Sequence, residues 1–271
     1  MNIKRTKVRL VGMFLMALPL TWISCDSESQ PAQVVPGQAL SFNVKVSNYQ
    51  ADDSQESRAV TTGYDTQFEN GDAFGLFVLD SDGAITYQNI KVTLQDGAWT
   101  TEKYVTYLYT RKYFAYAPYN EEYSDNSKYK TVKKVRDALA AFVPSKVQDT
   151  KDGYAANDLL MVHGDSQSGL VEATSGGVLD LTFEHQMALL ELNINKKEVD
   201  FVRATLDGGE PIKMFPATVT MGTTSAPVYR CIVSPGTYTV GGTFFKDGIR
   251  NIITEKEVTT EKGKYTRVNV K

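Results

Sequence analysis

The sequence of 271 residues contains only two histidines and two cysteines. With His163 and His185 alone, histidine-based acid–base or triad chemistry has few candidates. No glycine-rich phosphate-binding motif occurs, and only one apolar run, near the N-terminus, stands out in length. These scarcities argue against an enzyme. We expect no catalytic residue, no cofactor and no metal site.

Positive charge is also scarce, because the formal net charge at pH 7 is −3. Residues 1–24 carry four positive charges and no negative ones, so removing them takes the charge to about −7. A nucleic-acid-binding protein needs a basic face to neutralise phosphates. We therefore expect no nucleic-acid partner.

The N-terminus is organised like a secretory signal peptide. Basic side chains at 4–9 precede an apolar run at 10–20, which is too short to span a bilayer. Cys25 follows a small serine at the end of this run, which resembles a bacterial lipobox, where the cysteine is lipidated and becomes the first mature residue. The alternative is an ordinary signal peptide with an incidental cysteine. The acidic stretch Asp26–Ser29 resembles the surface-export signal of Bacteroidetes lipoproteins, so we expect a surface-exposed outer-membrane lipoprotein.

The remaining chain suggests a tether and two domains. Residues 1–24 are assigned to the signal peptide, and residues 25–38, rich in Ser, Gln, Pro and Gly, to a flexible tether. About 247 residues remain after signal removal, which suits two domains of ordinary size. We place the boundary near Gln186, which gives an N-terminal domain over 39–186 and a C-terminal domain over 187–271.

Period-two alternation predicts many short strands. In the first strand, the apolar side chains alternate with polar ones and are Leu40, Phe42, Val44 and Val46. Further strands are expected at 74–79, 84–94, 104–109, 159–162, 178–183, 187–194, 201–206, 219–221, 228–233, 238–245, 252–258 and 265–270, the last two as a hairpin. If Cys25 carries lipid, Cys231 is the only free thiol, and its alternating strand predicts a buried small hydrophobe.

Only residues 132–142 have apolar side chains at helical spacing, and Pro144 follows as a stop signal. Asp80–Gly83 hints at a calcium loop but lacks the further ligands of one, so we predict a hairpin turn. Many short strands with frequent turns favour a mainly β fold. We predict two tandem antiparallel β-sandwich domains of transthyretin-like or Greek-key type, with one short helix in the N-terminal domain.

Five short segments, taken in their order and spacing, resemble the fimbrillin-like lipoproteins of Bacteroidetes. They are Ser57–Ala59, Phe68–Phe77, Gly97–Trp99, Tyr113–Tyr119, and Asn157–Met161 running on to Leu181–Ala188. The resemblance covers the lipobox and the N-terminal domain well and the C-terminal domain loosely.

This resemblance implies assembly by strand exchange. In the family a protease cuts after an arginine that follows the first strand, that strand is lost, and the groove accepts a strand from another subunit. Arg58 stands at the matching position, so the implied processing site is Arg58 and Ala59, and the exchanged strand contains Leu40, Phe42, Val44 and Val46. The alternative is a solvated loop arginine that is never cut, because basal anchors of the family keep their lipid and first strand.

The implied function is a structural, anchor or accessory subunit of a cell-surface fimbria that contributes to adhesion. Its implied partners are other fimbrial subunits through strand exchange, the outer membrane through lipid on Cys25, and a host or bacterial surface ligand. The hairpin expected at 252–270 leaves no obvious donor tail beyond it, so the position within a fimbria stays open.

Two further alternatives concern side chains. Eight of the fifteen tyrosines lie between Tyr104 and Tyr129; they could form a platform for sugar rings, which makes glycan binding the second functional hypothesis, or pack a sandwich and its rim. His185 follows an apolar strand and is expected to hydrogen-bond locally rather than bind a metal. His163 is expected to lie in a turn with Asp165 and Ser166.

Overall fold

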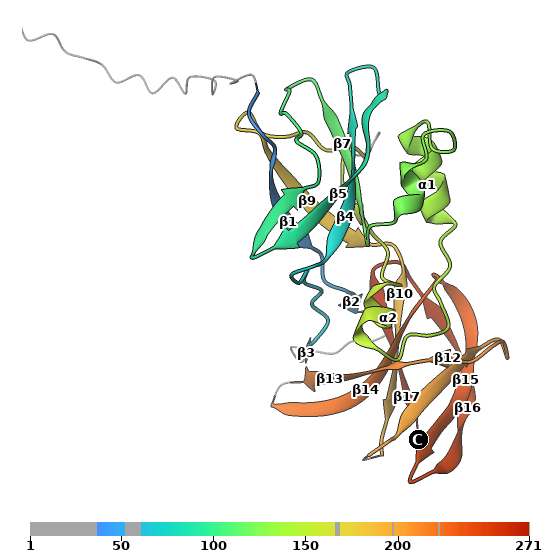
Figure 1. The fold of residues 1–271 in the computed structure, drawn as a ribbon. Helices are drawn as coiled ribbons and strands as arrows, with labels where there is room; N and C mark the ends of the chain where they lie inside the picture. The colour runs from blue at the N-terminus through green and yellow to red at the C-terminus, as the bar shows by residue number, and fades with distance from the viewer. Residues whose placement is uncertain (1–36, 52–60, 166–168, 197, 222, 271) are drawn as a thin grey trace, which may run out of the picture. The chain divides into compact units, whose positions relative to one another are not determined.

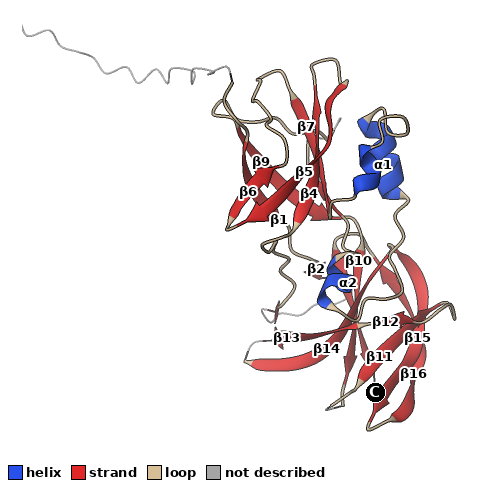
Figure 2. Ribbon diagram, viewed as in Figure 1, coloured by secondary structure: helices blue, strands red, loops and turns tan. Residues whose placement is uncertain are grey.

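Strands dominate the fold (Figure 2). The computed structural model describes residues 37–51, 61–165, 169–196, 198–221 and 223–270. In these ranges the chain forms seventeen strands in three sheets, two α-helices and one short 3-10 helix at Glu121–Ser124. The mainly β prediction is therefore confirmed.

The first sheet has seven strands, all of which lie between residues 41 and 185. Its order is β1-β9-β8-β7-β4-β5-β6. Central strands β4 and β7 are buried along almost their whole length, as expected for strands that are covered on both faces. The bounds are β1 Ser41–Val46, β9 Val178–His185, β8 Leu160–Val162, β7 Lys112–Ala117, β4 Ala73–Leu79, β5 Ile85–Gln95 and β6 Ala98–Thr101.

The second sheet has six strands in the order β2-β17-β10-β14-β13-β3. Neighbouring residues of β10 pack into different hydrophobic clusters: Leu189 joins the cluster shared with the first sheet, and Leu190 joins the cluster shared with the third. Both faces of the strand are therefore covered. The bounds are β2 Gln50–Ala51, β17 Lys264–Val270, β10 Ala188–Ile194, β14 Thr224–Val233, β13 Phe215–Met221 and β3 Thr61–Thr62.

The third sheet has four strands in the order β12-β11-β15-β16. The register of β15 on β16 shifts between Val240 and Gly242. Gly242 has a φ of +137°, and a Cβ there would lie 2.1 Å from the carbonyl oxygen of Arg203, so this bulge requires glycine. The bounds are β12 Ile212–Lys213, β11 Phe201–Leu206, β15 Gly236–Lys246 and β16 Ile249–Thr260.

The two helices have hydroxyl caps. Helix α1 (Val132–Ala140) begins where the Thr131 side chain accepts a hydrogen bond from the Lys134 amide, and it buries Val132, Val135 and Leu139. Its position confirms the helix expected at 132–142. Helix α2 (Lys151–Ala155) was not predicted, because five residues that include Gly153 show no apolar period. The prediction of a single helix is therefore wrong.

Strand direction differs from the all-antiparallel prediction. Strand β1 pairs with β9 in parallel, although their paired residues are 137 positions apart in sequence (Figure 1). Strand β17 is also parallel to both β10 and β2. Alternating polarity shows which face of a strand is buried but carries no information about the direction of its partner.

The strand expected at 104–109 is an extended segment with a single bridge, between Thr106 and Ala39. Val105 and Tyr107 are buried, whereas Tyr104 and Tyr109 are 65% and 72% exposed. The alternation predicted the buried side chains correctly. However, the main-chain hydrogen bonds between this segment and the chain before β1 involve only residues 38–40.

The C-terminal hairpin prediction is also wrong. Strands β16 and β17 are joined by a turn at 261–263, yet β16 pairs with β15 in the four-stranded sheet and β17 pairs with β10 and β2 in the six-stranded sheet. The sequence predicted the turn correctly, but it did not predict that the chain passes from one sheet to another at this turn. The tandem-sandwich organisation and the domain boundary near Gln186 stay predictions. Within the described ranges no helix is long and apolar enough to cross a bilayer.

Candidate functional site: the leader segment

The described residues 37–51, here called the leader segment, contribute strands to two different sheets. Strand β1 is an edge strand of the seven-stranded sheet, and β2 is an edge strand of the six-stranded sheet. The Ser47 amide donates to the Phe183 carbonyl at 2.9 Å, and the Gln50 amide donates to the Gly263 carbonyl at 3.0 Å. The leader segment therefore leaves one sheet and joins the next within three residues.

The four apolar side chains of the predicted exchange strand face the core. Leu40, Phe42, Val44 and Val46 are half-buried and pack against the larger hydrophobic cluster. The ring of Phe42 meets Phe74 edge-on, with 5.8 Å between centroids. Their partners in the β1–β9 register include Leu179, Leu181 and Phe183, all fully buried. The inward face of β1 is thus one wall of the core, whereas a role in strand exchange stays a prediction.

Polar contacts also hold the leader segment from Gly37 to Asn43. Asn43 donates to the Asp180 carboxylate at 2.9 Å, and the Leu40 amide donates to the Val105 carbonyl at 3.1 Å. The Tyr104 hydroxyl donates to the Gly37 carbonyl at 2.6 Å on the exposed surface. These bonds are spread along the start of the leader segment, and each is individually modest.

Tyr49, between β1 and β2, is the most deeply held side chain of the leader segment. It is only 4% exposed, and its hydroxyl donates to Asp158 Oδ1 at 2.8 Å. The same oxygen lies 2.8 Å from Nδ1 of His185, and the rings of Tyr49 and His185 stack with centroids 3.7 Å apart. Because an ionised carboxylate only accepts, the His185 nitrogen donates as well. Burial first, and then the nearby Asp158 charge, raise the pKa of Tyr49, which keeps its hydroxyl protonated as a donor.

The residues that follow segment 52–60 are also held in place. They lie at the edge of the six-stranded sheet opposite to β2. Strand β3 pairs with β13. Next to it, the Tyr64 hydroxyl lies 3.0 Å from both carboxylate oxygens of Glu191, which is fully buried in β10. Burial raises the pKa of Tyr64, and the Glu191 charge adds to the effect. The two sides of segment 52–60 are therefore held by separate buried clusters.

Two arginines neutralise Glu191. Arg230 Nε lies 3.0 Å from one carboxylate oxygen, and Arg267 Nε lies 2.5 Å from the other. The Arg230 guanidinium also covers the Tyr64 ring at 4.4 Å and donates to the Gly63 carbonyl at 2.5 Å. This cluster ties three strands of the sheet to the residues that follow segment 52–60.

Three predicted site residues, Cys25, Arg58 and Ala59, lie outside the described residues, so their roles stay predictions. Asp158 was not predicted. It belongs to the Asn157–Met161 segment, and His185 belongs to Leu181–Ala188, so two segments quoted for the family resemblance meet in one cluster. The sequence did offer one signal, because an aspartate directly before an apolar strand is rarely buried unless a partner pairs with it.

The two histidines and Cys231 lie in different surroundings. His185 hydrogen-bonds as predicted, although its partner is 27 positions away rather than local. His163 is exposed, 3.1 Å from Glu184. Burial raises the pKa of the Cys231 thiol to about 12, consistent with the predicted inert core role. In the part of the chain that the structure describes, no cluster of three or more His, Cys, Asp or Glu could hold a metal ion.

Most of the tyrosines between 104 and 129 pack the core. Five of the eight are buried, namely Tyr107, Tyr113, Tyr116, Tyr123 and Tyr129. Tyr116, for example, donates to Asn89 Oδ1 at 2.8 Å from inside the seven-stranded sheet. This region is therefore largely packing rather than an exposed aromatic platform. Asp80–Gly83 is a turn, as expected, with the Asp80 carboxylate accepting from the amides of Asp82 and Ala84.

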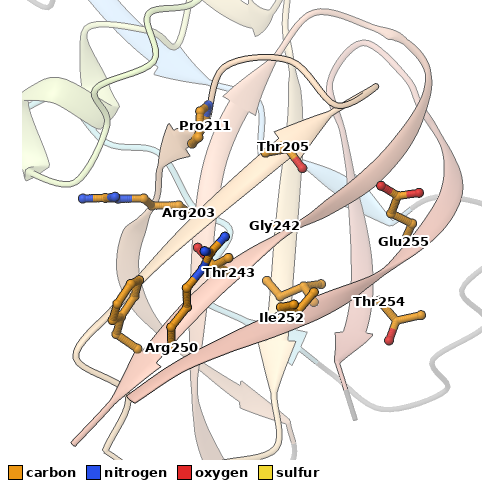
Figure 3. A pocket seen from close by; sticks show the side chains of 11 residues that line it. Arg203, Thr205, Pro211, Gly242, Thr243, Arg250, Ile252, Thr254 and Glu255 are labelled. Atoms are coloured by element: carbon orange, nitrogen blue, oxygen red, sulfur yellow. The ribbon is translucent and has the colours of Figure 1, made fainter. Parts of the chain in front are cut away.

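An open hollow of about 830 Å³ lies on the four-stranded sheet (Figure 3). Its lining includes Arg203 from β11, Thr243 from β15, and Arg250 and Ile252 from β16. Ile252 is 78% exposed, and neither arginine forms an ion pair with a described residue. The hollow combines apolar surface and hydroxyl groups with two arginines and the carboxylate of Glu255.

These features define a mainly β protein in which an N-terminal segment completes the edges of two sheets. The profile of the fimbrillin-like family matches residues 57–267, and the chain belongs to this family. Comparison with curated protein sequences finds no match.

Solved structures share the fold. A fimbrial protein from Bacteroides ovatus is 19% identical, with a TM-score of 0.57 over 86% of this chain and 49% of that chain. This chain therefore spans about half the length of that protein. A protein from Bacteroides ovatus described as a cell adhesion protein is 14% identical, with a TM-score of 0.54 over 86% of this chain and 91% of that chain. At these identities the likeness concerns the fold alone.

Proposed function

We propose that this protein is a subunit of a cell-surface fimbria, exported as a lipoprotein through Cys25, and that its leader segment is replaced by a strand of another subunit after a cut at Arg58. Family membership supports the fimbrial context. The observation that carries the strand replacement is the position of the leader segment at the edges of two sheets, with its apolar side chains in the core.

Loss of the leader segment would expose a sheet edge and part of the core, which a strand from another subunit could then cover. Strand β9 would become an unpaired edge, and the wall that covers Phe74 and Phe183 would be missing. Fully burying four apolar side chains contributes roughly 6–12 kcal/mol. Half-buried side chains contribute less, yet the loss remains comparable to the roughly 5–15 kcal/mol that stabilises a whole domain. An exposed sheet edge is a template for another strand.

The contacts on either side of segment 52–60 favour a clean separation at Arg58. Tyr49 lies on the side that would leave, and Tyr64, held by Glu191, lies on the side that would stay. The proposed cut would therefore break no strand pair among the described residues and would leave the new terminus tied to β13 and β10 through β3 and Tyr64. A subunit that keeps its leader and lipid would instead serve as an anchor or accessory subunit.

An arginine-specific protease tests the predicted processing site. We expect the native chain to be cut at Arg58 before any described arginine. Arg203, Arg230, Arg250 and Arg267 lie in paired strands, and Arg136 lies in α1. Arg111, which lies outside these elements, has its guanidinium held by the Thr106 carbonyl at 2.8 Å and by the Tyr87 ring. Intact-mass analysis over a time course identifies the first product. The Arg58→Lys variant, which keeps the charge but removes the arginine, should lose that product. A first cut elsewhere would contradict the assignment.

The second candidate function is saccharide binding at the hollow of the four-stranded sheet. The main-chain groups of β15 are paired on both sides, so a ligand there must be recognised by side chains. Thr243, Ile252 and Arg250 offer a hydroxyl, an apolar surface and a positive charge. Calorimetry with neutral and acidic polysaccharides, compared with an Arg250→Ala variant, tests this alternative. Filaments that disappear with the gene in electron micrographs, without any saccharide affinity, would favour the fimbrial function alone.

A further inference from the structure

The leader groove, defined as the surface of β9, β17 and residues 105–107 that contacts the leader segment, ends in a polar pocket. Asp158 and His185 are 6% and 2% exposed; His185 stacks on the Tyr49 ring, and Asp158 accepts the hydrogen bond of the Tyr49 hydroxyl. His185 Nε2 has no hydrogen-bond partner among the described residues, so the imidazole is held from one side only. The pocket therefore contains one buried carboxylate, that of Asp158. It accepts one hydrogen bond from His185 and one from Tyr49 of the leader segment.

We infer that Asp158 and His185 form a selective pocket for the phenolic hydroxyl of whichever strand occupies the leader groove. This inference rests on the proposed replacement of the leader segment. The incoming strand must then carry apolar side chains at four alternate positions and a tyrosine three residues beyond the last of them, as Tyr49 follows Val46. The four apolar positions fit many β-strands, whereas the tyrosine is a much narrower requirement.

The selectivity follows from the cost of an unpaired buried charge. A strand with phenylalanine at this position would keep the stacking on His185 but would leave Asp158 without its second donor. A hydrogen bond to a buried charged group changes an equilibrium by roughly 10- to 100-fold, and leaving such a group without its partner is more unfavourable than making the bond is favourable. A strand with a small side chain would also remove the ring that covers His185. Strands that lack the tyrosine are thus disfavoured by the pocket and not by the four apolar positions.

The position of the pocket lets it affect how a strand pairs with both sheets. Tyr49 lies between the Ser47 amide, which bonds β9, and the Gln50 amide, which bonds the turn before β17. A strand anchored at Tyr49 is therefore aligned in register on both edges at once. By contrast, the Tyr104 hydroxyl bond to Gly37 is exposed and touches only the start of the leader segment.

Hydrogen exchange of the uncut chain tests the pocket without any cleavage. In Tyr49→Phe we expect the amides of Ser47 and Gln50 to exchange at least about 10-fold faster, since roughly 1.4 kcal/mol corresponds to tenfold. The matched control is Tyr104→Phe, which also removes one hydroxyl bond to the leader segment and should change these rates less than about 3-fold. Unchanged protection in Tyr49→Phe would overturn the pocket.

A peptide competition tests selectivity in trans. A recognition sequence for a sequence-specific protease is inserted between Gln55 and Glu56, the chain is cut, and labelled peptides of residues 38–51 are added. The peptide with Tyr49→Phe should bind about 10- to 100-fold more weakly than the native peptide, and the control peptide with Lys45→Ala should bind like the native one. Equal binding of the Tyr49→Phe and native peptides would overturn the inference. If no peptide enters the groove, strand replacement is contradicted, and the hydrogen-exchange result alone decides the pocket.

Discussion

At the scale of single residues, the least expected feature is the fully buried Glu191 in the middle of an apolar strand. Its sequence neighbours in 188–194 are mostly apolar, so the residue stands where an unpaired carboxylate would not be tolerated. Two arginines and the Tyr64 hydroxyl satisfy it. The cluster explains how the residues after segment 52–60 can stay in place if the leader segment is removed.

Replacing Glu191 tests this cluster. Glu191→Ala should lower the free energy of unfolding by about 3–5 kcal/mol, because removing one partner of a buried ion pair leaves the others uncompensated. Urea unfolding monitored by tryptophan fluorescence measures the change. The control is Glu172→Ala, which breaks the exposed pair with Lys112 and should cost about 0–1 kcal/mol. A loss for Glu191→Ala as small as that of the control would show that the cluster does not stabilise the fold.

Part of this residue-level picture was predictable. Burial of Cys231 followed from the alternation of its strand, and hydrogen bonding of His185 followed from the apolar strand before it. The partner of His185 could not be predicted, because Asp158 comes from a different strand connection and only the pairing of β8 with β9 brings the two together. Sequence spacing predicts contacts within a strand or helix and carries little information about contacts between distant ones.

At the scale of elements, the decisive feature is β1, an edge strand whose parallel partner is 137 positions away in sequence. A strand joined to its sheet by a partner so distant in sequence has a loop-closure cost to overcome when it pairs. Its four inward side chains are half-buried rather than fully buried. The strand is therefore held by the sum of many partly buried contacts, and Tyr49, just beyond it, adds one fully buried contact.

Truncating the inward face of β1 should weaken this strand measurably. Phe42→Ala is expected to lower the free energy of unfolding by about 1.5–3 kcal/mol, below the cost for a fully buried aromatic ring because Phe42 is half-buried. Urea unfolding measures the change, and hydrogen exchange at Ser41 and Ser47 locates it. Lys45→Ala, on the exposed face of the same strand, is the control and should stay within about 0.5 kcal/mol. Equal effects of the two substitutions would contradict the inward packing of β1.

The existence of most strands was predictable, and their partners were not. Alternation identified β1, β9, β10 and β11, and the helical period identified α1. The parallel pairings of β1 with β9 and of β17 with β10 leave no trace in the local pattern, because a strand alternates in the same way beside a parallel or an antiparallel neighbour. The extended segment at 104–109 shows the opposite error, since its alternating burial occurs without a ladder.

At the scale of the whole molecule, the sequence separates into a short leader segment and a larger remainder that contributes nearly every strand. Among the described residues, the leader segment supplies β1 and β2, and the other fifteen strands follow segment 52–60. The family match begins at residue 57, so it covers the remainder and leaves out the strands of the leader segment. This division matches the proposed processing, in which lipid and first strand lie on one side of Arg58.

The measurement that tests this account most directly is mass spectrometry of the protein purified from cells and from isolated fimbriae. The account predicts that chains in fimbriae begin at Ala59, and that the complementary precursor carries lipid on Cys25 and retains residues 37–51. Chains in fimbriae that all keep the leader segment, or an absence of the protein from fimbriae, would contradict strand replacement as its mode of assembly.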